Sequence, residues 1–536
     1  MFKIIKDQSG MALIVLLSLL LVMTIIGVGV VMEATNEVDI GGNEGRSTNS
    51  FWAAEAGAEK AVAAIKTSYQ TYGLPPSPLP GDTFTLGKYT VIYSTVDNGA
   101  ATQKQLTVGS YAGLYALVKG FTITSEATEN TTGEKSSIVQ VIEDGLVPIF
   151  QFAVFYEGDL EIHPGPTMTL GGRVHTNKNM YLGSHSTLNI SSRATAAGNI
   201  FHARKPGSGE SEGTGGVMIK DANGVYRNMK NADGTWLDCN YPNWTTLSTS
   251  RWGGMVEDKS HGITELYLPI VRSGEQIDLI KRASGNPDSY ENQAKLKIVD
   301  GTALYRANVS DTTWTNVTAT LTASGALSTN SFFDGREGKW VSSTDIDIAK
   351  LNTSGYFPSD GVLYASSEAI RLKNGSTVLT PLTVATDNPL YTIGNFNSTN
   401  KKSVCLMADA LTVLSGSWND GKSDSSLSKR VASNTTVNCC FMTGNQNTGE
   451  GGSSYNGGLE NLIRFLEKWD DKTFTFRGSM VDTWNSEQAV GNWSYGGYYT
   501  APNRDWQFDT DLLDPTKLPP GYPKINVIQK VSWTEG

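Results

Sequence analysis

The chain opens with a sharp change from polar to apolar positions. Residues 1–10 include charged side chains, whereas the next 22 residues, Met11 to Met32, contain none. At about 1.5 Å per residue, this run makes a helix of roughly 33 Å, which is long enough to cross the hydrocarbon core of a membrane. We therefore predict a membrane-spanning helix near the start of the chain.

The helical pattern continues beyond the apolar run. From Phe51 to Ile65, apolar residues recur at three- and four-residue spacing, which predicts an amphipathic helix as far as about Thr67, within a helical segment assigned to residues 11–72. Gly41 and Gly42 interrupt the pattern, and we expect them to loosen the helix locally. A Pro-rich loop then ends it.

Residues 83–150 change to an alternation of period two. Three runs rich in β-branched and aromatic residues begin at Tyr89, Tyr115 and Ser137, and clusters of Gly, Asn and Thr separate them. They predict a small antiparallel sheet that packs on the long helix.

A 20-residue repeat follows, in which residues 160–179 align with residues 180–199. Such a period is typical of a solenoid, in which each coil buries its strands on the next, so we expect a parallel β-helix to begin in residues 151–205. Two similar hairpins in a sandwich are the alternative. The aligned positions are Thr167/Thr187, Arg173/Arg193 and Asn179/Asn199, with apolar pairs Leu160/Met180, Ile162/Leu182, Met168/Leu188 and Leu170/Ile190.

The repeat is lost in residues 206–360, which we interpret as an insertion, and short alternating runs return in residues 361–536. The predicted fold class is α+β and mostly β, with a long helix, a small antiparallel sheet and a large β-rich head. One amphipathic helix is also predicted in the last region, from apolar residues at helical spacing: Leu459, Leu462, Ile463, Leu466 and Trp469.

Composition and charge narrow the choice of partners. A chain of 536 residues is too long for one core, so two to four domains are expected. The net charge is −10 without a strongly basic stretch, which argues against nucleic acid. Four cysteines form no C-x-x-C pair, so zinc is not expected. Cys405 could pair with Cys439 or Cys440 in an oxidising exterior, or all could stay free thiols.

Charges around the apolar run predict its orientation. Lys3 and Lys6 precede it, and Glu33, Glu37 and Asp39 follow it. The positive-inside rule then keeps the N-terminus in the cytoplasm and exports the bulk of the chain. The length of the run and the residues after it fit a cleaved secretory signal poorly. A signal anchor that is never cut is the simplest alternative.

The first 65 residues or so resemble PilX-type minor pilins of type IV pili. The resemblance implies a leader, residues 1–10, that prepilin peptidase removes, methylation of the new N-terminus, and a helix that packs among other pilin helices. It is carried by a glycine before an apolar start, an asparagine near the middle of the helix and an A-A-E-A-G box: Gly10, Met11, Asn43, Ala53, Ala54, Glu55, Ala56 and Gly57.

This sequence departs from major pilins at one position. They carry a glutamate at the fifth mature residue, where it neutralises a neighbouring N-terminal amine, whereas counting from Met11 gives Val15 here. An unpaired ion in an apolar filament core is costly. The resemblance therefore implies a place at the filament tip, with no subunit beyond. Alternatively, Val15 merely faces lipid.

Candidate reactive residues form no recognisable catalytic or metal-binding motif, and we expect no enzymatic activity. Two carboxylate pairs, Asp345/Asp347 and Asp509/Asp511, lack a catalytic spacing. Four histidines near the repeat occupy different repeat positions and are expected in loops or on the surface: His163, His175, His185 and His202.

Two other clusters could bind ligands. Asn419, Asp420 and Asp424 supply hard oxygen ligands, so calcium is possible there, and no other cofactor is expected. A second cluster is aromatic and suits sugars or protein partners, unless it folds onto the core: Trp493, Tyr495, Tyr498 and Tyr499.

Three functions remain open. The first is a minor pilin in the inner membrane that assembles with other pilins and reaches the pilus or cell surface, at the tip or in an initiating complex. The second is the large K-type minor pseudopilin of a type II secretion system. The third is a membrane-anchored β-helix protein that acts on polysaccharide or serves as an adhesin.

Overall fold

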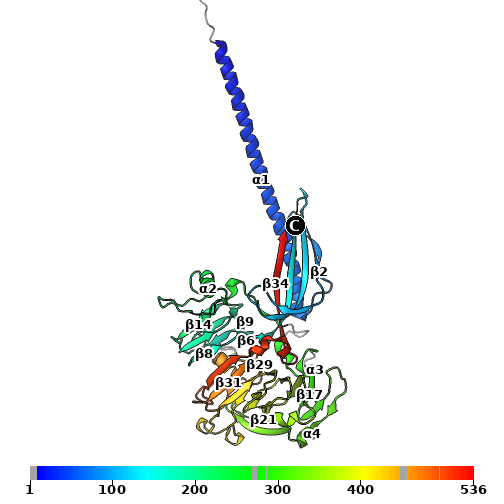
Figure 1. Cartoon of the computed structure of the whole chain (residues 1–536), viewed down its shortest axis with the longest axis vertical. Coiled ribbons are helices and arrows are strands. Elements are labelled where there is room, and N and C mark those ends of the chain that lie inside the picture. Colours follow the sequence, from blue (N-terminus) through cyan, green and yellow to red (C-terminus); the bar gives the residue numbers. More distant parts are fainter. Residues whose placement is uncertain (1–8, 269–274, 284–285, 447–454, 494, 536) are drawn as a thin grey trace, which may run out of the picture.

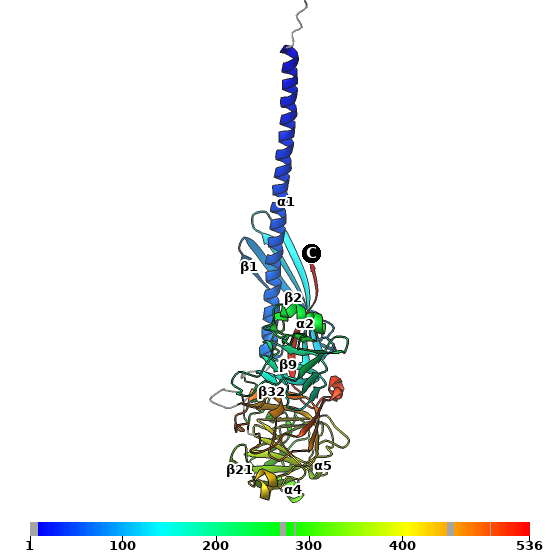
Figure 2. The same ribbon diagram turned by 90° about the vertical axis from the view of Figure 1, so that its left-hand side faces the viewer.

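The computed structural model describes residues 9–268, 275–283, 286–446, 455–493 and 495–535. A single helix, α1 (Ser9–Tyr72), stands out at one end, a small sheet lies along its second half, and a large head lies beyond the sheet on the same long axis (Figures 1 and 2). The predicted α+β class with a long helix and a β-rich head is confirmed.

Helix α1 shows no break at Gly41 and Gly42, so the prediction of a local loosening there is wrong. Each glycine costs a helix about 1 kcal/mol, which long helical flanks on both sides outweigh. The helix ends where Tyr72 meets Gly73, which adopts a left-handed backbone with φ of 65°.

We call the small sheet the proximal sheet. It is antiparallel, as predicted, but it has a strand from the far end of the chain: β34 pairs with β5, from Lys524↔Pro148 to Glu535↔Ile138. The end of the region predicted as residues 361–536 therefore belongs to this sheet. Its strands are β1 (Asp82–Leu86), β2 (Tyr89–Asp97), β3 (Thr102–Gln105), β4 (Tyr115–Glu129), β5 (Lys135–Pro148) and β34 (Lys524–Glu535).

The first part of the head stacks parallel strands that lie 20 residues apart in sequence. Leu160 pairs with Met180, Met168 with Leu188 and Val174 with Ala194, so the repeat alignment is confirmed and the hairpin alternative is wrong. The strands are β6 (Phe152–Tyr156), β7 (Leu160–Ile162), β8 (Met168–Leu170), β9 (Arg173–Thr176), β10 (Met180–Leu182), β11 (Thr187–Ile190), β12 (Ala194–Ala196), β13 (Ile200–His202), β14 (Gly216–Lys220), β15 (Tyr226–Asn228) and β16 (Val256–Glu257).

The second part of the head stacks further parallel strands, and β17, β18, β19 and β20 also form antiparallel pairs. They are β17 (Ala294–Val299), β18 (Thr302–Tyr305), β19 (Thr315–Asn316), β20 (Leu327–Asp334), β21 (Lys339–Asp347), β22 (Gly361–Ser366), β23 (Ala369–Lys373), β24 (Leu382–Ala385), β25 (Leu390–Ile393), β26 (Val404–Ala408), β27 (Leu411–Leu414), β28 (Thr435–Asn438), β29 (Cys440–Asn445), β30 (Ile463–Phe465), β31 (Thr473–Gly478), β32 (Met480–Asn485) and β33 (Asn503–Phe508).

One twelve-stranded sheet joins the two parts. Its order is β16-β12-β9-β6-β32-β29-β26-β24-β22-β17-β18-β19. The chain enters in the middle at β6, builds outward to β16, passes to the other end at β17, and returns strand by strand until β32 pairs with β6. Apolar side chains from the head's sheets share one large core.

The predicted insertion is not a separate unit. Within residues 206–360, β14 and β16 extend the first stack, and β17 and β21 extend the second. The repeat signal fades there because the coils carry excursions of unequal length. The short helices of the head lie in or beside these excursions: α2 (Trp244–Trp252), α3 (Tyr290–Gln293), α4 (Thr318–Ala323) and α5 (Ile348–Asn352).

The amphipathic helix predicted near Leu459 is absent from the described residues. A short 3-10 turn, Leu459–Asn461, leads instead into β30, which pairs in parallel with β27. Nearly every residue from Tyr455 to Trp469 is buried, including polar ones such as Arg464 and Glu467. In a segment buried all round, helical spacing does not distinguish a helix from a strand.

Two further observations concern the core and the junction. All four cysteines are free, although Cys405 and Cys440 are paired positions on the neighbouring strands β26 and β29.

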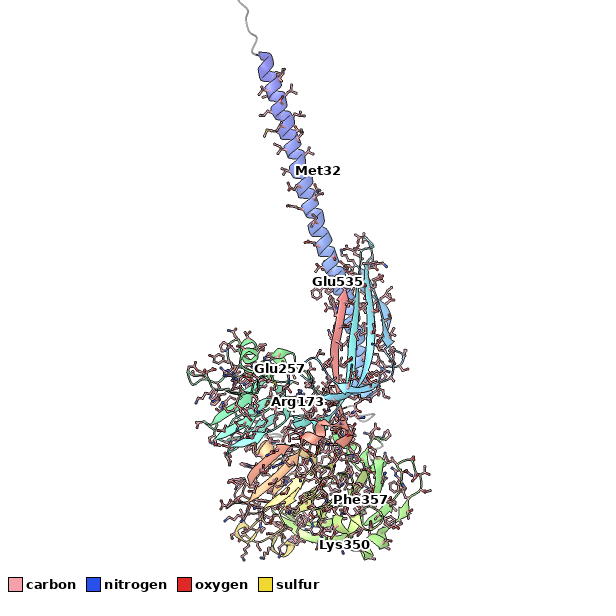
Figure 3. The ribbon with its side chains drawn as sticks, viewed as in Figure 1. Met32, Arg173, Glu257, Lys350, Phe357 and Glu535 are labelled. Carbon is pink, nitrogen blue, oxygen red and sulfur yellow. The ribbon has the colours of Figure 1, made fainter. Side chains whose placement is uncertain are left out.

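Arg173 lies where the head meets the proximal sheet (Figure 3), and its guanidinium donates to the carbonyl oxygens of Ser110 and Ala112 in the loop before β4.

Candidate functional site

The first half of α1 is an apolar surface that no described part of the chain covers. Within Leu13–Val38, a window of 18 residues has a mean hydropathy of 3.0, and none of this window is buried. Val15 is 63% exposed on this surface. Gly10 and Met11 lie in the first turns of the helix, and the side chains of Met11 and Asn43 lie outside the described ones. Exposed Leu, Ile and Val over this length call for a membrane or neighbouring helices.

The second half of α1 packs on the proximal sheet through small residues. Ala53, Ala54 and Gly57 of the A-A-E-A-G box are buried, whereas Glu55 and Ala56 are half-buried. A Cβ atom on Gly57 would lie 2.7 Å from Val91 Cγ1 and closer still to the hydroxyl of Ser125. The box therefore allows the helix backbone to approach β2 and β4 closely.

Glu55 also lines a groove between α1 and β34. The groove has a volume of about 330 Å³, and its walls include Glu59, Lys530 and Trp533. Lys530 pairs with Glu59, and the ring of Trp533 meets Phe51 edge-on, with ring centroids 5.5 Å apart. The C-terminal strand thus contacts the helix directly.

A cavity in the head brings together part of the predicted aromatic cluster. We call it the aromatic pocket; it has a volume of about 320 Å³. The rings of Trp493 and Tyr495 stack with centroids 6.1 Å apart, and Tyr455 meets Trp493 edge-on at 5.2 Å. The wall residues are His163, Gly165, Pro166, His185, Arg204, Glu210, Tyr455, Gly457, Glu460, Trp493, Tyr495, Tyr499, Ala501 and Arg504.

The four predicted aromatic residues divide into three environments. Tyr495 is 56% exposed, whereas Tyr499 is buried and its hydroxyl accepts a hydrogen bond from Trp493 Nε1 at 2.5 Å. Trp493 is half-buried against the core. Tyr498 is exposed outside the pocket, and its ring lies against Gly335. The prediction of an exposed binding surface fits Tyr495 and Tyr498, whereas the alternative of a loop folded onto the core fits Tyr499.

Buried charged groups surround the pocket and were not predicted. Glu161 is fully buried and accepts hydrogen bonds from Arg204 Nη1 at 2.9 Å, from the Lys205 amide at 2.8 Å and from the Tyr455 hydroxyl. Burial raises the pKa of Glu460 to about 7. These groups come from distant segments, so no spacing in the sequence could have revealed them.

The prediction that the histidines lie in loops or on the surface is wrong for His175 and His202, which belong to the buried strands β9 and β13, whereas His163 and His185 lie in loops. His163, His175 and His202 are buried, and burial lowers the pKa of each to about 4. His175 bonds Thr195 at 2.8 Å and Asn177 at 3.0 Å, and His202 stacks on Trp236 at 3.4 Å. His185 is exposed. The described residues contain no group of three metal-ligating side chains.

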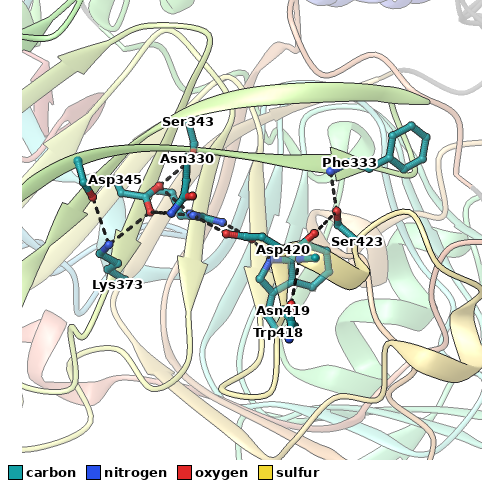
Figure 4. Close-up of polar contacts among 12 residues, drawn as sticks. Asn330, Phe333, Ser343, Asp345, Lys373, Trp418, Asn419, Asp420 and Ser423 are labelled. Atoms are coloured by element: carbon teal, nitrogen blue, oxygen red, sulfur yellow. Dashed lines mark hydrogen bonds and ion pairs between the residues drawn. The ribbon is translucent and has the colours of Figure 1, made fainter.

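A buried ion-pair network occupies several candidate carboxylates (Figure 4). Asp345 binds Arg371 through two hydrogen bonds of 2.8 and 2.7 Å, and Arg371 also binds Asp420. Burial opposes ionisation of Asp345, but Arg371 outweighs it and holds the pKa of Asp345 below its usual value. Asp347 caps α5 at the amide of Lys350. This network stabilises the far end of the head.

The other acidic candidates are engaged in similar ways. Asp509 and Asp511 both bind Lys401, so this pair serves as an ion-pair anchor. Asn419 caps a turn at the amide of Gly421, and Asp424 is exposed. Calcium binding at Asn419, Asp420 and Asp424 stays a prediction, and a calcium ion would compete with Arg371 for Asp420.

The comparisons with known proteins bear on the N-terminal segment. The family described as PilX N-terminal matches residues 9–59, which are the exposed apolar half of α1 and its small-residue box. The match covers this segment and leaves the head outside it. It supports a minor pilin related to type IV pili as the class of protein, and the N-terminal apolar helix is consistent with a membrane anchor.

The remaining comparisons add little about the head that follows this segment. The chain is similar to the competence-associated pilin ComZ from Thermus thermophilus, at 11% sequence identity and a TM-score of 0.30, over 91% of this chain and 97% of that one. No curated protein matches the sequence.

Proposed function

We propose that this protein is a minor pilin that prepilin peptidase cleaves after Gly10 and that acts at the tip of a type IV pilus or in its initiating complex. Its apolar helix first lies in the inner membrane with the N-terminus in the cytoplasm, and the head is exported. After cleavage and methylation of Met11, the same apolar surface packs against the helices of other pilins. Its role is assembly and contact with the outside, without catalysis.

The position of the head supports the tip. The exposed half of α1 and the head lie at opposite ends of the molecule along one axis (Figures 1 and 2). If subunits stack by their helices, a second subunit placed further along the axis would have to occupy the space of the head. A subunit of this shape therefore fits the tip, where no further subunit has to be placed along the axis.

Val15 supports the same place. It lies on the uncovered apolar surface and offers no carboxylate to a neighbouring amine. An ammonium group left without a partner in an apolar core is costly, so a subunit beyond this one would be disfavoured. The same argument fits the tip of a type II secretion pseudopilus, so the assembly must be identified by experiment.

We further propose that the stacked parallel strands of the head form one β-helix. The 20-residue register in the first stack and the return of the chain through β32 to β6 support this architecture. Coils that bury their strands on one another would make a stiff extension beyond the filament body.

Cleavage is tested by producing the full chain with and without a prepilin peptidase and determining the mature N-terminus by mass spectrometry. We expect a chain that begins at methylated Met11, and an uncleaved chain for Gly10→Val. Gly27→Val is the matched control, since Gly27 lies in the same helix with open space around it. An unchanged mass of the wild type in the presence of the peptidase would refute cleavage.

The tip position is tested by labelling the head with gold-coupled antibody on isolated pili. One label at a filament end is expected, and labels along the filament would contradict the proposal. Deletion of the gene should reduce the number of pili. Loss of protein secretion with normal pili would assign the protein to a secretion system instead.

A further inference from the structure

The aromatic pocket has a combination of walls that the proposed assembly role does not use. It lies in the head, away from α1, and its open side carries Tyr495, which is 56% exposed although it is a large aromatic residue. Nothing in filament packing through α1 explains an exposed tyrosine stacked on a half-buried tryptophan.

The aromatic wall is held in place from behind. Trp493 donates its indole N–H to the hydroxyl of Tyr499, which is 2% exposed, and Tyr455 supports the edge of the same ring. Gly457, with φ of 83°, lets the chain pass directly beneath the indole, because a Cβ there would lie 2.7 Å from Trp493 Cδ1. An aromatic ring fixed in this way offers a preformed apolar face.

The polar walls carry carboxyl groups as well as guanidinium groups. Arg204 forms an ion pair with buried Glu161, and Arg504 donates to the backbone carbonyl oxygen of Glu460 at 3.2 Å. The carboxyl groups of Glu210 and Glu460 also belong to the wall. The pocket therefore has no surplus of positive charge that would attract a carboxylate or phosphate group. It offers both donors and acceptors beside an apolar face.

Two donors of the wall residues have no partner among the described residues. His163 Nε2 accepts a hydrogen bond from the Gly213 amide at 3.2 Å, so in the neutral ring the hydrogen lies on Nδ1, and that atom is buried without a partner. Arg504 Nε is likewise buried without a partner. Both atoms lie beneath the surface of the pocket wall, where an unpaired donor is unfavourable.

We propose that the aromatic pocket binds a neutral saccharide unit. A sugar ring has an apolar C–H face that packs on an aromatic ring, and its hydroxyl groups both donate and accept, as the mixed Arg, Glu and His walls require. This inference does not depend on the tip position, because the pocket would bind its ligand wherever the subunit lies.

The test uses the full chain in a zwitterionic detergent, because detergents with sugar head groups would compete for the pocket. The probes are immobilised neutral oligosaccharides built from hexoses and N-acetylhexosamines, with uronic-acid oligosaccharides as a second panel. We expect binding to neutral members, and titration calorimetry of the strongest one then gives the affinity. The loss of affinity in Tyr495→Ala should be about tenfold and in Trp493→Ala at least as large.

Tyr498→Ala is the matched control, since Tyr498 lies three residues from Tyr495 and outside the pocket; its affinity should match the wild type. If Trp493→Ala does not fold, Tyr495→Ala still decides, because an exposed side chain can be removed without a cavity. Binding to neither panel, binding to uronic acids alone, or an unchanged affinity in Tyr495→Ala would each overturn the proposal.

Discussion

The proximal sheet and the head are both β structures, but they are built from contacts of different range. In the proximal sheet, β1, β2, β4 and β5 pair in chain order, and only β34 comes from elsewhere. In the head, most strands pair with one that lies a coil away, apart from local antiparallel pairs such as β17–β18 and β20–β21, and β32 pairs with β6 more than 300 residues earlier. Local pattern therefore determines most of the first region, whereas the second depends on contacts that close late in the sequence.

The two regions also differ in how their buried surfaces are made. Helix α1 approaches the proximal sheet through alanines and a glycine, so the interface is close and depends on the absence of side chains. The head buries large apolar residues together with complete ion pairs such as Asp345–Arg371. The helix–sheet interface should therefore be sensitive to added side-chain volume, and the core of the head to the loss of one member of a buried ion pair.

Removal of Arg371 should have the largest effect. Arg371→Met leaves the buried carboxylate of Asp345 with only weaker partners, and we expect the free energy of unfolding of the head to fall by about 3–5 kcal/mol. Hydrogen–deuterium exchange should rise in β21 and β23 and stay unchanged in β4 and β5.

The matched control is Arg227→Met, because the side chain of Arg227 is 49% exposed beside Asp221 and its loss should change little. The double variant Asp345→Asn/Arg371→Met should regain part of the lost stability. Equal effects of Arg371→Met and Arg227→Met would contradict the role of the buried pair.

Asp144 gives the proximal sheet a dependence on pH. It is fully buried, accepts a hydrogen bond from Asn526 of β34, and burial raises its pKa from 3.8 to about 7. Because the folded state holds the proton more tightly, its contribution to stability is complete below pH 3.8 and is lost as the pH rises to 7. An asparagine at this position cannot ionise, so in Asp144→Asn the stability does not fall as the pH rises.

We therefore expect Asp144→Asn to stabilise the pairing of β34 with β5 by about 4 kcal/mol at pH 8 and to change little at pH 4. Hydrogen–deuterium exchange of β34 at the two pH values measures this difference. A gain in stability of the same size at both pH values would show that ionisation of Asp144 is not the cause.

Added volume at Gly57 should have the smallest of the three effects. Gly57→Val forces the helix away from Val91 and Ser125, and we expect a loss of about 2 kcal/mol from the helix–sheet interface. Gly45→Val on the same helix meets open space and serves as the control for helix propensity. Thermal unfolding of both variants gives the comparison, and similar melting temperatures would argue against close packing at Gly57.

The extent of successful prediction follows the same division. The long helix, the first strands of the proximal sheet and the 20-residue register could be predicted because each is a short-range periodicity. Strand β34 has the alternation of a strand, but nothing in its residues indicates that its partner is β5. The segment after Leu459 has the polar spacing of an amphipathic helix, but its polar residues, such as Arg464 and Glu467, are buried in hydrogen bonds and ion pairs instead of facing solvent.

The candidate site was predicted only where it is local. Trp493 and Tyr495 lie close together in the chain and were identified as a binding surface. Glu460 reaches the backbone of His163 across 297 residues, and such contacts leave no trace in spacing. The sequence predicts loop or surface histidines because they occupy different positions in the repeat, whereas neutral imidazoles can bond within a core, as His175 does.

The pairing of Lys524 with Pro148 has a mechanical consequence. The chain leaves the proximal sheet for the head at Pro148 and returns at Lys524, so both covalent connections start from the same end of two neighbouring strands. A pull on the head therefore divides between β5 and β34 and runs along their length, where it must shear many hydrogen bonds together instead of opening them one at a time. Arg173, bound to the loop before β4, adds a third point of attachment beside them. The head is therefore attached along two neighbouring strands and a loop instead of through a single linker.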